Sequence, residues 1–152
     1  MTTKAEFNAE EWSTIANAPF LTGMLVIAAA RGGTVREPLA ISRAYAAARA
    51  EQPDGLLKEI LATPPAIDPA KRPRTPEDLR REAPAALREA IEILTRVGTE
   101  DEVIAYKRFV YELADAVARA HREGGFLGIG GTEVSEHEQA ALDEIAAIFD
   151  EL

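Results

Sequence analysis

The chain has 152 residues, no cysteine and a formal net charge of -9 at pH 7, a length that favours one domain large enough to hold a core. The absence of cysteine excludes disulfides and thiolate metal sites and makes a reducing cytoplasm the expected compartment, and the negative charge argues against general nucleic-acid binding. Hydrophobic residues are 47% of the chain, and its many alanines favour closely packed helices.

The first predicted helix begins with two local signals. Asn8 and Glu11 have the spacing of a capping box, in which each side chain bonds the backbone of the other residue. Phe7 and Trp12 have the spacing of a hydrophobic staple. These signals predict a short helix over about 9–17 that ends before a proline.

A second helix is predicted directly after Pro19, over about 19–31. It is apolar on nearly every side, as is typical of a helix in the middle of a bundle, and Gly23 would let a neighbouring helix approach closely. The apolar run 18–30 also resembles a signal-peptide core, but acidic residues precede it and the run is too short to span a bilayer. We expect a buried central helix, no membrane insertion and a cytoplasmic protein.

A third helix is predicted over about 35–50, with Pro38 in its first turn, where a missing N–H costs little. A turn at 52–55 then leads to a short fourth helix. The apolar side chains expected to be buried in these two helices are Ile41, Ala44, Tyr45, Ala48, Leu56, Leu57, Ile60 and Leu61.

The segment 63–75 contains four prolines, which prevent a regular helix. The part of the chain on either side of it would be small for an independent domain. We therefore interpret it as a connection between two halves, about 1–62 and 76–152, of a single domain covering 1–152.

Three helices are predicted in the second half. A threonine and a proline at 75–76 begin the fifth helix, which Pro84 is expected to kink or split. Thr99 and Glu102 form a capping box for the sixth, and the seventh covers about 136–150. Their predicted buried side chains are Leu87, Ile91, Leu94, Val103, Tyr106, Val110, Leu113, Val117, Leu142, Ile145, Ala146 and Phe149.

The two halves repeat one pattern. The apolar run 20–30 is followed by a glycine break and by Thr34 with a glutamate three places later. The run 103–120 is followed by the glycine-rich segment 124–131 and by Ser135, again with a glutamate three places later. The pattern predicts an all-α fold, a compact bundle of about seven helices built from two pseudo-repeated helix-turn-helix halves.

The segment 117–149 combines an alanine-rich helix end, a glycine turn, Val-Ser-Glu-His-Glu at 134–138 and Ala-Leu-Asp-Glu-Ile-Ala at 141–146. This combination resembles the repeated half of TerB-like domains, which are associated by name with bacterial tellurite resistance. The segment 20–50 resembles the same unit more weakly, and the two stretches together cover a little under half of the chain. The resemblance implies a compact seven-helix bundle with pseudo-two-fold halves and a bacterial, stress-associated role.

The turns of this chain differ from those of the family it resembles. In TerB-like domains the turn commonly reads Ala-Asp-Gly, and its acids are associated with a metal-binding patch. Here 30–32 reads Ala-Arg-Gly and 120–122 reads Ala-His-Arg, so both aspartates are missing. We therefore predict neither a bound metal nor a cofactor.

The glycine-rich segment is the best candidate for a ligand or partner site, because glycine lets backbone N–H groups approach a ligand closely. It lacks the lysine of a P-loop, and a purely structural turn explains it as well. A cation site between the two histidines that flank it is a further interpretation. The candidate binding residues are His121, Gly128, Gly130, Gly131 and Glu133.

No pattern of a nucleophile with its base, or of a dinucleotide site, is present, so we expect no catalytic residue. The basic cluster within 71–81 is diluted by acids and is interpreted as a solvated linker. The favoured hypothesis is a non-catalytic protein-interaction or stress-associated module with an unknown protein partner. The alternative is a small-molecule or divalent-cation binding protein that uses the 121–138 region, and an uncovered apolar helix face would instead make the chain a homodimer.

Overall fold

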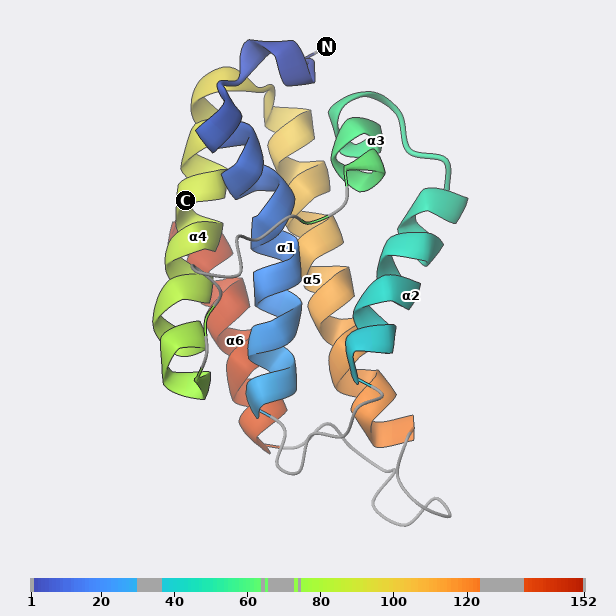
Figure 1. Cartoon of the computed structure of the whole chain (residues 1–152), viewed down its shortest axis with the longest axis vertical. Helices are drawn as coiled ribbons and strands as arrows, with labels where there is room; N and C mark the ends of the chain where they lie inside the picture. The colour runs from blue at the N-terminus through green and yellow to red at the C-terminus, as the bar shows by residue number, and fades with distance from the viewer. Residues whose placement is uncertain are drawn as a thin grey trace.

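The computed structural model describes residues 2–29, 37–63, 65, 73, 75–123 and 136–151, and every regular element in them is helical. This confirms the all-α prediction. The described elements are a short 3-10 turn at Lys4–Glu6 and six α-helices, namely α1 (Ala9–Ala29), α2 (Glu37–Ala50), α3 (Gly55–Ala62), α4 (Pro76–Val97), α5 (Glu100–Glu123) and α6 (Glu136–Glu151) (Figure 1).

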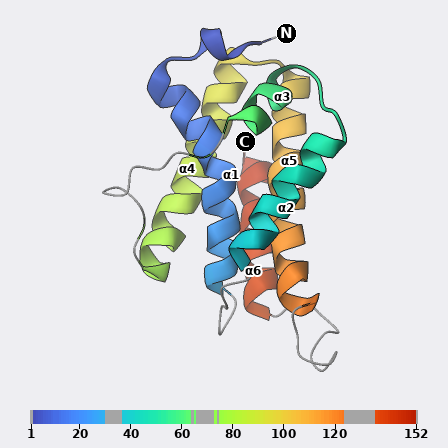
Figure 2. The same cartoon turned by 45° about the vertical axis from the view of Figure 1, so that its right-hand side comes forward.

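Helix α1 lies in the middle of the bundle, where it contacts α4 most extensively, α5 and α6 less, and α2 and α3 least. Helices α1 and α5 run in one direction, and α2, α4 and α6 run in the other (Figure 1). Helix α2 packs on α5, on the opposite side of α1 from α4, and the short α3 lies near the end of the bundle that holds the N-terminus (Figures 1 and 2). The predicted central helix is therefore confirmed.

The break predicted at Pro19 was wrong, because α1 continues through it from Ala9 to Ala29. The described residues consequently form six α-helices instead of about seven. A proline removes the N–H that would bond the carbonyl of Ile15, four residues earlier, but the hydroxyl of Tyr106 donates to that carbonyl at 2.9 Å. Pro84 likewise lies inside α4, which is not split there.

The predicted caps are confirmed. The backbone N–H of Asn8 donates to Glu11 Oε1 at 2.9 Å, and the N–H of Glu11 donates to Asn8 Oδ1 at 2.8 Å. Thr99 and Glu102 form the same reciprocal pair at 3.0 and 3.2 Å. The Thr75 hydroxyl accepts an N–H from the first turn of α4 at 3.1 Å. Local spacing therefore fixes where α1, α4 and α5 begin.

One cluster of buried apolar side chains includes residues from both halves of the chain. A Cβ built on Gly23 would lie 2.9 Å from Ile41 Cδ1 and 2.9 Å from Leu113 Cδ2, so α2 and α5 approach α1 closely there, as predicted. The predicted core side chains that are buried are Ile41, Tyr45, Leu56, Ile60, Leu61, Leu87, Ile91, Leu94, Tyr106, Val110, Leu113, Val117, Leu142 and Ile145.

Helix α1 is also long and apolar enough, by length and composition alone, to cross a membrane. The run 18–30 was predicted to be too short to span a bilayer, but the helix that contains most of it begins at Ala9 and has 21 residues. Half of the most apolar 18-residue stretch of α1 is buried inside the protein. A core helix and a membrane span share this composition, and the packing of α1 is that of a core helix.

Candidate functional site

The predicted glycine-loop site lies outside the described residues. Gly128, Gly130, Gly131 and Glu133 fall in the undescribed segment, and the side chain of His121 at the end of α5 is likewise not described. Binding of a small molecule or cation by the 121–138 region therefore stays a prediction. Within the part of the chain that the structure describes, no group of three or more histidine, aspartate or glutamate side chains is placed to hold a metal ion.

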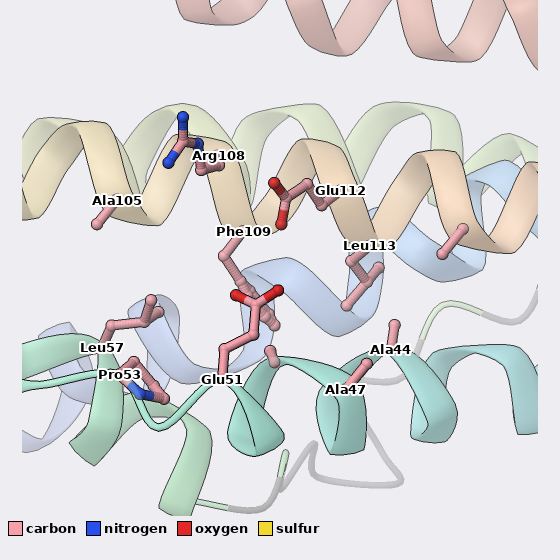
Figure 3. Close-up of a pocket in the computed structure, with 12 residues that line it drawn as sticks. Ala44, Ala47, Glu51, Pro53, Leu57, Ala105, Arg108, Phe109, Glu112 and Leu113 are labelled. Carbon is pink, nitrogen blue, oxygen red and sulfur yellow. The ribbon is translucent and has the colours of Figure 1, made fainter.

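The described residues contain a different candidate, a groove of about 270 Å³ between α2 and α5. One wall comes from α2 and the other from α5, while Pro53 and Leu57 line the end near α3 (Figure 3). We call this hollow the α2–α5 groove. Its lining residues are Ala44, Ala47, Ala48, Glu51, Pro53, Leu57, Ala105, Arg108, Phe109, Glu112, Leu113 and Ala116.

Alanine explains why the groove is open. Ala44, Ala47 and Ala48 are spaced so that they share one face of α2. The sequence predicts Ala44 and Ala48 in a buried stripe, but the structure leaves both only half-buried. A methyl group is too short to fill the space between two helix surfaces, so the floor is completed by Phe109 and Leu113 from α5. The groove is therefore an apolar surface into which another backbone can come close.

Three charged side chains border this apolar floor. Glu51 extends from the end of α2 and Glu112 from the facing wall of α5, and both reach toward the space above Phe109 (Figure 3). Arg108 lies one turn before Glu112 on the same helix. None of the three forms a hydrogen bond or an ion pair with a described residue. An arginine four residues before a glutamate is the less favourable order for a helical ion pair, which is consistent with this arrangement.

A buried tyrosine lies behind the groove. Tyr45 in α2 packs edge-on against Phe109, with ring centroids 5.3 Å apart. Its hydroxyl is buried and has no hydrogen-bond partner among the described residues. Burial raises the pKa of Tyr45 far above its ordinary value, and the charge of Arg49 offsets only part of that effect. Tyr45 therefore stays protonated at neutral pH and cannot act as a base beside the groove.

A second, more polar hollow of about 470 Å³ lies beside the turn that joins α2 to α3. Arg49, Asp54 and Lys58 supply its charges. The Arg49 Nε donates to the carbonyl oxygen of Leu61 at 3.2 Å, near the C-terminus of α3, where a cation is favoured by the helix dipole. Arg49 thus has a structural role at the end of α3, and the α2–α5 groove is the better candidate for binding.

The sequence did not predict this groove. The alanines of α2 predict a core-facing stripe, and nothing in the local pattern shows that the facing wall of α5 also carries small residues, Ala105 and Ala116. The groove could have been predicted from alanines that share one face on each of two predicted helices, together with charged residues beside those faces.

Comparison of the chain with protein-family models, with curated proteins and with solved structures found no match. The TerB-like resemblance is accordingly carried by the residues of the sequence alone.

Proposed function

We propose that this chain is a non-catalytic, cytoplasmic protein-interaction module that receives a helical segment of a partner protein in the α2–α5 groove. The supporting observation is the open apolar floor, which is lined by alanines on both walls and bordered by charges that pair with no described residue. An amphipathic helix laid into an apolar groove is a recurring mode of recognition. The bacterial, stress-associated role implied by the TerB-like resemblance is compatible with such a module.

The anatomy of the groove supports binding of a protein segment. Protein interfaces combine an apolar centre with a polar rim, and here Phe109 and Leu113 lie at the centre while Glu51, Arg108 and Glu112 lie at the edge. Small side chains on both walls allow a partner backbone to approach, as Gly23 does for α2 and α5 inside the core. A third helix in the groove would extend the packing that already builds the bundle.

Site-specific photocrosslinking in cells tests the proposal. A benzoylphenylalanine would replace Ala47 on one wall or Ala116 on the other, because both positions are exposed. The control position is Glu92, which is exposed on α4, on the other side of α1 from α2 (Figure 1). We expect the two wall positions to capture the same partner and Glu92 to capture none. Identical products from all three positions, or none from either wall, would overturn the proposal.

A further inference from the structure

We infer that the partner helix is basic and places a lysine or arginine side chain between Glu51 and Glu112. This inference rests on the proposed function of the α2–α5 groove and names the chemistry of its partner. It follows from the placement of charges around the groove. An apolar floor alone would not specify the charge of the partner.

The two carboxylates come from opposite walls, and both side chains point toward the space between α2 and α5 (Figure 3). Neither has a cation among the described residues within ion-pair distance. A cation placed between two carboxylates is attracted by both of them. A basic side chain seated there would meet a carboxylate on each side while its aliphatic stem packs on the apolar floor.

The charge of the whole chain points the same way. A net charge of -9 attracts a cationic segment at long range and speeds its encounter. Arg108 is the single cation among the lining residues of the groove. Because it lies one turn from Glu112, it offers a place for an acidic residue of the partner one turn away from the basic one. The groove therefore favours a basic residue of the partner at its centre and an acidic residue one turn away on the same helix.

A second copy of this chain is a poorer occupant. A symmetric dimer uses the same patch on both subunits, so Glu51 and Glu112 of each copy would enter one interface. Four carboxylates and only two arginines would then meet in a partly dehydrated space, and this excess of negative charge disfavours that pairing. A homodimer through the α2–α5 groove is therefore not the arrangement that the charges support.

A displayed library of helix-forming peptides tests the inference with the full chain as bait. The peptides would be about 16 residues long, slightly longer than α2, and their groove-facing positions would be randomised among apolar, acidic, basic and neutral polar residues. A groove-blocked variant, Ala47→Trp/Ala116→Trp, serves for counter-selection, since both positions lie outside the core. Circular dichroism would verify that this variant keeps the helical fold.

We expect the groove-dependent peptides to carry lysine or arginine at a central facing position. The dissociation constant of the best peptide, measured by fluorescence anisotropy, should rise about tenfold in Glu51→Gln/Glu112→Gln and should also rise with salt. The matched control is Glu89→Gln/Glu92→Gln, which makes the same change in net charge at exposed positions of α4 and should leave binding unchanged.

The outcomes separate the two proposals. Groove-dependent peptides without basic residues, or equal binding to wild type and Glu51→Gln/Glu112→Gln, would overturn the basic partner and leave the groove as an interface. Enriched peptides that bind the blocked variant equally well, or no enrichment at all, would overturn the proposed function as well.

Discussion

The hydroxyl of Tyr106 in α5 donates a hydrogen bond of 2.9 Å to the carbonyl oxygen of Ile15 in α1. Pro19 has no N–H to offer this carbonyl, so the ordinary helical bond cannot form. Both Ile15 and Tyr106 are buried, so this carbonyl needs a donor from within the protein. The tyrosine therefore completes the hydrogen bonding of α1 and at the same time fixes α1 against α5.

Tyr106→Phe should lower the free energy of unfolding by about 1–3 kcal/mol, because the carbonyl of Ile15 would be left buried without a donor. Urea denaturation measures the change. Pro19→Ala returns the backbone N–H, so the loss caused by Tyr106→Phe should shrink in the Pro19→Ala background. Strictly additive effects in this double-mutant cycle would show that the two residues do not act on the same carbonyl.

Tyr45→Phe should change the free energy of unfolding in the opposite direction. The hydroxyl of Tyr45 is buried and finds no partner in the described part of the chain. Its removal therefore relieves a desolvation cost and should raise the free energy of unfolding by about 1 kcal/mol. The same urea titration compares the two tyrosines directly. A loss as large as that of Tyr106→Phe would mean that the hydroxyl of Tyr45 has a partner in solution.

The two buried tyrosines also predict a loss of stability in alkali. Burial raises the pKa of both phenols, and the neighbouring Tyr45 raises that of Tyr106 further. A raised pKa means that the folded state favours the neutral phenol. The free energy of unfolding is therefore at its full value below the unfolded pKa of about 10, and it decreases as pH rises through the pKa values of the folded state. Above about pH 10 the free energy of unfolding should fall by about 1.4 kcal/mol per pH unit for each tyrosine. The slope should be halved in Tyr45→Phe.

Local signals in the sequence predicted the helix starts, and long-range contacts decided the continuity of α1. The capping pairs Asn8 with Glu11 and Thr99 with Glu102 lie three residues apart, so their geometry is set by the helix itself. The compensation for Pro19 comes from a residue 91 positions away from the carbonyl it satisfies. No rule of local spacing contains that contact, and the proline therefore predicted a break.

The candidate site depends on the same kind of information. Ala44 and Ala48 have the spacing of core residues, and only the separation of α2 from α5 makes them part of a groove. Glu51 and Glu112 come together from different halves of the chain, while each alone fits a solvated helix surface. The glycine-rich segment has the more unusual composition, so the binding site was predicted there and not between two ordinary alanine-rich helices.

Glu102 connects the N-terminal segment to α5. Its contribution to the free energy of unfolding should decrease at acid pH. Burial raises its pKa, but hydrogen bonds from Thr2 at 2.7 Å and from Thr99 outweigh that effect and lower it. Glu102→Ala should cost about 1 kcal/mol at pH 7. Because a lowered pKa gives stability above the unfolded value of about 4.3, the gap between wild type and variant should narrow below that pH. Glu100→Ala, at an exposed position of the same turn, should show a smaller and salt-dependent loss.

The turn after α2 contains a residue in the left-handed region. Gln52 has a φ of 53°, and its N–H donates to the carbonyl of Arg49 at 3.0 Å, which closes the end of the helix. A side chain in this conformation costs about 1–2 kcal/mol that glycine avoids. Gln52→Gly should therefore raise the melting temperature, whereas Gly55→Ala should lower it, since Gly55 has a φ of 65°. If Gln52→Gly instead lowers the melting temperature, the side chain of Gln52 contributes more to the turn than its backbone strain removes.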